Sequence, residues 1–149
     1  MEIVTATDIS ILKNLPNLRY LKIYGLRKVE DISCLTEIGT LRKLFLENTK
    51  HLSDLNFLDG NQKLVALGVE GSMYTKQKIA SLEPLSRMKS LEAIFLTSVQ
   101  LADKNLDYLS SLPQLTFLSC AKFAPKSSFE SLRTLMPNLN CHWCDKYEI

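Results

Sequence analysis

The chain has 149 residues, of which 46% are hydrophobic and 23% are charged, and its net charge is +2. This length and composition are typical of one globular domain and exclude a disordered chain. No apolar run approaches the ~18 residues that a transmembrane helix needs, and the basic residues are spread along the chain. We therefore expect neither membrane insertion nor nucleic-acid binding.

The N-terminal segment MEIVTATDIS carries an acidic residue at its second position and has neither a basic start nor an apolar stretch. It does not match a secretory signal, so we predict a cytoplasmic protein. The segment from Ile3 to Leu15 is expected to cover the N-terminal edge of the core. Residues 1–149 are predicted to form a single domain.

Leucine accounts for 27 of the 149 residues, and the six-residue pattern LxxLxL recurs along the chain. The copies are LRYLKI from Leu18, LRKLFL from Leu41, LVALGV from Leu64, LEAIFL from Leu91, LTFLSC from Leu115 and LNCHWC from Leu139. Their starts lie 23, 23, 27, 24 and 24 residues apart. Alternating apolar residues of this kind predict a strand in each copy.

Between the copies, apolar residues recur at every third position, as in the run Val29, Ile32, Leu35, Ile38 and Leu41. This period matches a 3-10 helix, in which side chains at i and i+3 eclipse. Each repeat is therefore predicted to be one strand and one short helical return. Neither half buries its apolar face alone, so the repeats must stack into a solenoid.

These repeats resemble the leucine-rich repeat family, in its short class of about 22 residues. The resemblance covers nearly the whole chain, as a partial N-terminal repeat and about five to six repeats. It implies an α/β fold: a right-handed solenoid with a six-stranded parallel sheet on the concave face and short helical or 3-10 segments on the convex face. The chain departs from the family at the asparagine slot that follows each strand, which here holds Leu26, Thr49, Ser72, Val99 and Phe123.

Strand alternation places the residues between the apolar positions on the concave face. The outward residues that we predict to bind a protein partner are Tyr20, Lys22, Tyr24, Lys43, Phe45, Glu47, Glu70, Phe95, Phe117 and Trp143. They surround a low centre of Ala66, Gly68 and Ala93, and the acidic members, with Asp145, form one rim. Aromatic residues clustered beside small ones are typical of a recognition surface. The alternative is that aromatic residues simply cover a sheet surface well.

The spacing of 27 between the third and fourth copies, where others are 23 or 24, marks an insertion within residues 71–80. It is predicted to emerge at the rim of the concave face near Glu70. Met73, Tyr74, Lys76 and Lys78 are candidates for further contacts, because such loops often carry function. A neutral surface insertion is the alternative.

The segment CHWC, from Cys141 to Cys144, is the main candidate for chemistry, because a CxxC pair can form a redox couple or half of a zinc site. The repeat pattern argues against both roles. It places Cys141 outward and Cys144 inward, on opposite faces of a strand, and no second CxxC completes a zinc set. Cys144 and Cys120 are expected to be small buried residues, with reduced thiols.

The two histidines, His51 and His142, lie far apart in the repeats, and the sequence contains no GxGxxG or P-loop motif. We therefore predict that the chain is not an enzyme and has no catalytic residue, cofactor or metal. The resemblance implies a module that binds a protein partner through its concave face, and the compact size is similar to immunity or inhibitor proteins that neutralise a toxin or enzyme.

Two other functions stay open at this point. One is a metal- or redox-active protein that uses the CHWC motif. The other is a scaffold subunit that assembles through open sheet edges, because only DKYEI follows the last expected strand. We expect a monomer or a weak homodimer.

Overall fold

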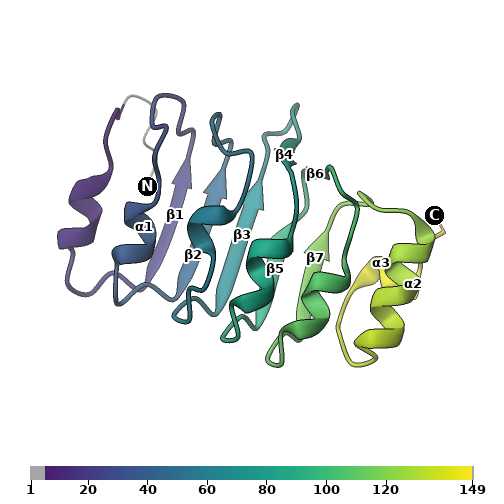
Figure 1. Cartoon of the computed structure of the whole chain (residues 1–149). Helices are drawn as coiled ribbons and strands as arrows, with labels where there is room; N and C mark the ends of the chain where they lie inside the picture. The colour runs from purple at the N-terminus through teal and green to yellow at the C-terminus, as the bar shows by residue number, and fades with distance from the viewer. Residues whose placement is uncertain (1–5, 149) are drawn as a thin grey trace.

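The computed structural model describes residues 6–148, so the first part of the expected N-terminal cover, including Ile3, lies outside the described residues. A parallel sheet forms one layer and short helical segments form the other (Figure 1). The sheet has the strand order β1-β2-β3-β5-β7. Its strands are β1 (Tyr20–Tyr24), β2 (Lys43–Glu47), β3 (Ala66–Glu70), β5 (Ala93–Leu96) and β7 (Phe117–Cys120). We call the face of this sheet that is turned away from the helical segments the concave face.

The register of the sheet follows the LxxLxL copies residue for residue. Tyr20 pairs with Lys43, Lys43 with Ala66, Ala66 with Ala93, and Ala93 with Phe117. These are the third residues of the first five copies. The solenoid of stacked strands predicted from the repeats is confirmed over this part of the chain.

Short helical turns return the chain from each strand to the next, as the three-residue period predicts. The segments are η1 (Ser10–Asn14), α1 (Cys34–Glu37), η2 (Asn56–Leu58), η3 (Glu83–Arg87), η4 (Asp107–Ser111) and α2 (Lys126–Leu135). Four of these six segments are 3-10 helices, in which residues three apart lie on one face. Most of their apolar residues, such as Leu12, Leu35, Leu58, Leu85 and Leu109, are therefore buried against the sheet.

The core consists of the inward residues of the strands and of the helical segments. Leu44 and Leu46 of β2 are buried between strand neighbours, and Leu55 and Leu58 approach them from the return that follows β2. The same packing repeats from Ile9 to Cys141 as one continuous cluster. Because each inward side chain contacts residues of the adjacent repeats, burial of apolar surface holds the repeats together.

The insertion within residues 71–80 forms a strand, which the sequence pattern did not predict. β4 (Gln77–Ile79) pairs in parallel with β6 (Val99–Leu101) in a second, two-stranded sheet. Ile79 is buried, and the side chain of Gln77 donates a hydrogen bond of 2.5 Å to the carbonyl oxygen of Leu52. The insertion is therefore fixed to its neighbouring repeats, and only its first half forms a free turn.

The sixth expected strand does not form, so the prediction of a six-stranded sheet is wrong. Asn140 makes a single parallel bridge with Phe117, where the repeat alignment would pair Phe117 with Cys141. The last repeat is thus shifted by one residue, and such a shift turns each side chain to the other face of the sheet. Cys141, predicted to face outward, is fully buried, and the next residues form the short helix α3 (His142–Asp145).

The C-terminal end of the sheet is covered, contrary to the expectation of an open edge. The indole Nε1 of Trp143 donates a hydrogen bond of 2.8 Å to the carbonyl oxygen of Cys120. The hydroxyl of Tyr147 donates to the carbonyl oxygen of Ala124 at 3.0 Å. Phe129 of α2 is fully buried in the same end of the core. The chain folds back as α3, and this cover satisfies backbone groups that an edge strand would leave open.

In four of five repeats, a buried residue fills the slot that carries asparagine in the family pattern, and the fifth residue, Ser72, is half-buried. Leu26, Val99 and Phe123 occupy it without a polar group, and Thr49 places its hydroxyl there. Oγ1 of Thr49 is buried and has no hydrogen-bond partner among the residues that the structure describes. A buried hydroxyl without a partner opposes folding.

Leu44→Ala should lower the free energy of unfolding by about 2–5 kcal/mol, because it opens a cavity between three repeats. Urea unfolding followed by circular dichroism measures this change. Lys43→Ala is the matched control, since the neighbouring side chain is exposed, and its effect should stay within about 0.5 kcal/mol. Equal effects of both changes would contradict the assignment of inward and outward residues.

Thr49→Val should leave the free energy of unfolding unchanged or raise it by about 1 kcal/mol, because a methyl group replaces an unpartnered hydroxyl of the same size. The same urea titration measures it. A loss of more than about 1 kcal/mol would mean that the hydroxyl has a partner in solution, such as a bound water.

Candidate functional site

Four aromatic rings form a continuous row across the concave face. Tyr20 of β1 lies 5.8 Å from Phe45 of β2, measured between ring centroids. Phe45 lies 5.4 Å from Phe95 of β5, and Phe95 lies 5.4 Å from Phe117 of β7. The rings are tilted by 43–49° to one another, within the arrangements that aromatic pairs favour. We call these four residues the aromatic row.

The contact between Phe45 and Phe95 depends on glycine at position 68. The two residues sit on β2 and β5, with β3 between them, so their rings must lean over β3 to meet. A Cβ atom at Gly68 would lie 2.2 Å from Cδ1 of Phe45. Gly68 and Ala66 are themselves buried. The low centre predicted from the small residues is therefore filled by the aromatic rings.

Exposure differs along the aromatic row. Tyr20 is 56% exposed, whereas Phe45, Phe95 and Phe117 are half-buried by contact with one another and with the sheet. Tyr24, at the other end of β1, is also exposed. The row is thus a preformed apolar stripe that is partly open to solvent.

The predicted acidic rim is largely paired within the chain. Lys22 approaches Glu47 across the β1–β2 pair, with 3.1 Å between Nζ and Oε2, and the hydrogen bond to Glu47 raises the pKa of Lys22. Glu70 accepts a hydrogen bond from the hydroxyl of Thr97. Lys43 lies exposed at the start of β2. These groups flank the aromatic row, and the ion pair of Lys22 with Glu47 neutralises two of their charges.

Trp143 does not lie on the concave face as predicted. It belongs to α3, where its ring is half-buried against the end of the core and its indole N–H donates a hydrogen bond to the carbonyl oxygen of Cys120. The ammonium of Lys122 lies 5.7 Å from the ring centroid. Asp145, also expected at the rim, pairs with Arg133 of α2. The shift of the last repeat by one residue removes both residues from the predicted site.

The free turn of the insertion exposes two large residues, Met73 at 88% and Tyr74 at 90%. The turn is closed by Ser72, whose hydroxyl contacts that of Thr75 at 2.7 Å. An open groove of about 800 Å³ lies beside it, at the edge of the sheet where the strands end. Its lining includes Tyr74, polar residues of the loop after β2, and four cations.

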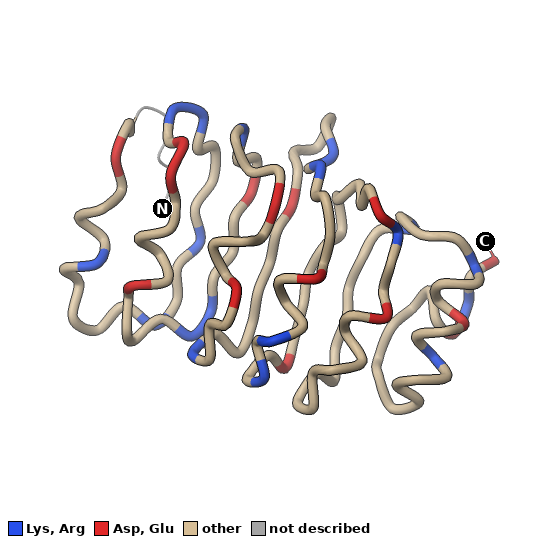
Figure 2. Tube along the Cα trace, in the orientation of Figure 1, with Lys and Arg blue, Asp and Glu red and all other residues tan. Residues whose placement is uncertain are grey.

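The four cations of this groove are Arg27, Lys50, Lys76 and Lys78. No carboxylate lines the groove, and none of the four has an ion pair among the described residues. Figure 2 shows basic segments at one end of the strands, in the loops after β1 and β2 and near β4. We call this the basic groove. Arg27 and Lys50 hold the same position in consecutive repeats, a signal that the sequence contained but that the prediction did not use.

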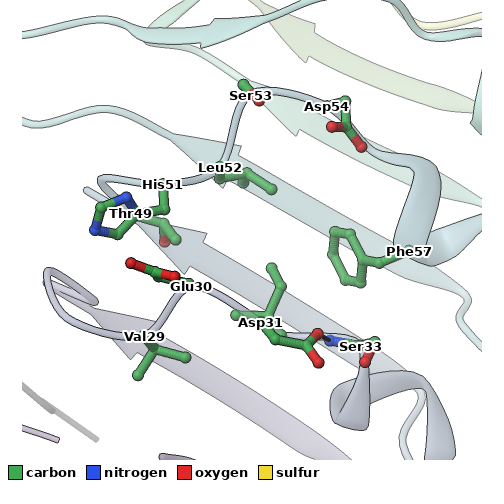
Figure 3. A pocket seen from close by; sticks show the side chains of 11 residues that line it. Val29, Glu30, Asp31, Ser33, Thr49, His51, Leu52, Ser53, Asp54 and Phe57 are labelled. Carbon is green, nitrogen blue, oxygen red and sulfur yellow. Dashed lines mark hydrogen bonds between the residues drawn. The ribbon is translucent and has the colours of Figure 1, made fainter. Parts of the chain in front are cut away.

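A smaller pocket of about 130 Å³ lies between the loops that follow β1 and β2 (Figure 3). Two of its carboxylates serve the backbone: Asp31 accepts the N–H of Ser33 at 2.8 Å, and Asp54 accepts the N–H of Asn56 at 2.9 Å. His51 is exposed, and its Nε2 lies 3.1 Å from the carbonyl oxygen of Arg27. These side chains hydrogen-bond to the backbone of the loops that precede the helical turns. This structural role explains why aspartate and histidine occur there, without a catalytic role.

Three cysteines lie at the C-terminal end of the core, with Cys141 fully buried and Cys120 and Cys144 half-buried against the same cluster. The prediction that Cys141 and Cys144 leave opposite faces is wrong, because α3 bends the chain between them. Cys34 lies apart from the other three, in α1. All four cysteines are free thiols.

Within residues 6–148, no group of three or more histidine, cysteine, aspartate or glutamate side chains is arranged to hold a metal ion. No described helix is long and apolar enough to cross a bilayer.

Comparison with known proteins establishes the fold. The chain is similar to internalin C2 from Listeria monocytogenes, with 23% identity and a TM-score of 0.61, over 90% of this chain and 54% of that protein. It is also similar to a second Listeria monocytogenes internalin, inlF, with 18% identity and a TM-score of 0.49, over 90% of this chain and 50% of that one. The chain thus spans about half the length of both. The sequence matches no family model and no curated protein.

Gly68→Ala should separate Phe45 from Phe95, because the added methyl group occupies the space of the Phe45 ring. We expect the ring-current shifts of both phenylalanines to change in NMR spectra while the far-ultraviolet circular dichroism stays the same. Gly39→Ala is the control, since a Cβ there would meet only Nζ of Lys63 at 3.8 Å. Unchanged phenylalanine resonances in Gly68→Ala would contradict the packing of the aromatic row.

Proposed function

From the leucine-rich repeat fold of this chain, which it shares with the solved internalins, we propose that the chain is a non-catalytic module that binds a protein partner through its concave face. The observation that carries the proposal is the aromatic row of Tyr20, Phe45, Phe95 and Phe117. Rigid aromatic side chains are the commonest anchors of protein interfaces.

The arrangement of the row favours binding for two physical reasons. Its rings pack against one another, and the ring of Phe45 fills the space above Gly68. The side chains are therefore already ordered, and little side-chain entropy is lost when a partner docks. The row is also apolar and partly open to solvent, and covering its exposed surface would add hydrophobic stabilisation.

The dimensions of the row favour a macromolecule over a small ligand. It extends from β1 to β7, across four inter-strand spacings or roughly 19 Å. Lys22, Lys43, Glu47 and Glu70 surround it with polar and charged groups. An apolar centre with a polar rim is the usual anatomy of a protein interface.

The basic groove indicates the charge of the partner. Its four cations have no acidic neighbour in the lining, whereas Glu47 and Glu70 are already paired with groups of the chain. A partner that reaches from the aromatic row to the basic groove would therefore be favoured if it carries carboxylates at that edge. Tyr74 stands beside the groove and would add an apolar contact.

Neutralisation of a toxin or enzyme is a narrower form of this proposal. Its support is the small size of the chain and analogy to other repeat proteins, and fold analogy alone does not fix a function. The charges of the basic groove favour an acidic target.

Phe45→Ala combined with Phe95→Ala should leave the fold intact and weaken partner binding by about 100-fold or more, because anchor residues commonly contribute above 2 kcal/mol each. The measurement is capture of binding proteins from the native host by the immobilised chain, followed by titration of the captured partner. Circular dichroism of the double variant checks folding.

Ile11→Ala is the matched control, since Ile11 is also an exposed apolar residue, at 71%, but lies in η1. It should retain full capture. Equal capture by the double variant and the parent chain would place the binding surface elsewhere. A loss caused equally by Ile11→Ala would indicate nonspecific adhesion.

A further inference from the structure

The basic groove lies along one edge of the second, two-stranded sheet. That sheet consists of β4 and β6 (Figure 1), so among the described residues β4 has a neighbouring strand on one side only. The lining of the groove includes Gln77 and Lys78 of β4 and residues of the loop that follows β2, but no residue of β6. The groove therefore lies on the side of β4 that faces away from β6.

The hydrogen bonds of β4 leave one backbone N–H and one C=O on the groove side. The N–H of Gln77 donates to the carbonyl oxygen of Ser98 at 2.8 Å, and the carbonyl oxygen of Ile79 accepts the N–H of Ala102 at 2.9 Å. Because the residues of a strand alternate in the direction of their backbone bonds, the N–H and C=O of Lys78 point away from β6. Neither group has a hydrogen-bond partner in the part of the chain that the structure describes.

Two contacts join the walls of the groove. The N–H of Ala80 donates a hydrogen bond of 2.9 Å to the carbonyl oxygen of Ser53, which ties the end of β4 to the loop after β2. The side chain of Gln77 bridges the same two segments by its bond to the carbonyl oxygen of Leu52, and because Gln77 is buried, this tie lies below the surface of the groove. The space beside the backbone of Lys78 is therefore held open by the fold before a ligand binds.

We propose that the basic groove binds a short, extended, acidic segment of the protein partner. The segment pairs with the free edge of β4 through its backbone and places its carboxylates among the four cations. The inference rests on the proposed function, because it names the part of the partner that this groove takes. It makes the groove a second binding site, separate from the aromatic row.

The charges of the groove match such a segment on both of its walls. Arg27 and Lys50 belong to the loops after β1 and β2, whereas Lys76 and Lys78 belong to the insertion and β4. Alternate side chains of an extended chain share one face and lie about 6.6 Å apart, so carboxylates on the solvent-facing side of the segment reach cations of either wall. Because no carboxylate lines the groove, the segment meets no like charge there.

The backbone of Lys78 favours a peptide over a small anion. Its carbonyl oxygen needs a hydrogen-bond donor, which a phosphate dianion does not have, whereas a peptide offers both an N–H and a C=O to the edge of a strand. Main-chain bonds of this kind supply affinity, and the charges of the side chains supply specificity. Tyr74, which is 90% exposed and lines the same groove, would add an apolar contact with the segment.

The test titrates the full-length chain into a fluorescein-labelled, end-capped peptide of alternating glutamate and valine, and follows fluorescence anisotropy. We expect binding that weakens when sodium chloride rises from about 50 to about 300 mM, because exposed charges are screened. A peptide with glutamine in place of each glutamate should bind at least about tenfold more weakly.

The backbone contact is tested with two further peptides, N-methylated either at the valine or at the glutamate amides. One of the two should bind about two- to tenfold more weakly than the parent peptide, because only alternate N–H groups face β4 and one hydrogen bond is lost. Equal binding of both methylated peptides and the parent peptide would show that no pairing with β4 takes place.

Lys76→Gln combined with Lys78→Gln should weaken binding of the acidic peptide by about three- to thirtyfold, as the loss of two exposed ion pairs does. Lys104→Gln combined with Lys146→Gln is the matched control, since it removes the same charge from two exposed lysines outside the groove. It should bind the peptide as the parent chain does, and circular dichroism checks that both variants fold. Equal weakening in both variants would reduce the effect to net charge and overturn the site.

The variant with Phe45→Ala and Phe95→Ala should bind the acidic peptide as the parent chain does, because the aromatic row does not line the groove. Peptide binding together with undiminished capture of the partner by this variant would overturn the role of the aromatic row and leave the groove standing. Absence of peptide binding to the parent chain, or displacement of the peptide by inorganic phosphate at the same concentration, would overturn the groove as a peptide site.

Discussion

The inward side chains of the repeats constrain everything else in this molecule, because each of them must fit between the side chains of the preceding and following repeats. Leu21, Leu44, Leu67, Ile94 and Leu118 are paired across five parallel strands and are all buried. A slip of one residue in any strand would turn its apolar side chains to solvent and its polar ones into the core. The burial of leucine thus fixes the strand register, and the register fixes which residues share the concave face.

The aromatic row follows from that register together with a second, local condition. Phe45 and Phe95 are separated by β3, and they meet only because Gly68 presents no side chain where their rings lean. The same contacts that hold the rings also bury part of their surface. The row is therefore both a packed layer of the sheet and a candidate anchor for a partner. Aromatic coverage of a sheet and recognition, which compete as explanations of the sequence, are compatible in this structure.

The sequence pattern is interrupted at two places, at the insertion within residues 71–80 and at the C-terminus. At the insertion, the chain does not form a free loop but adds β4 beside β6, which leaves a short exposed turn next to the basic groove. At the C-terminus, the last repeat shifts by one residue and bends into α3, so that Trp143 covers β7 and Cys141 enters the core. In both places, unsatisfied backbone groups and apolar surface at the edge of a repeat are covered by residues that break the repeat.

The sequence by itself determined the solenoid, the first five strands, their register and the outward position of nine of the ten predicted contact residues, because leucine spacing is a local and repeated signal. Only the tertiary structure decided which of those residues contact one another. The leaning of Phe45 toward Phe95, the pairing of Lys22 with Glu47 and the joining of four cations in one groove depend on contacts between repeats. The places of Trp143 and of Cys141 depended on the tertiary structure most, because the packing of the last repeat against β7 and α2 accompanies its shift by one residue.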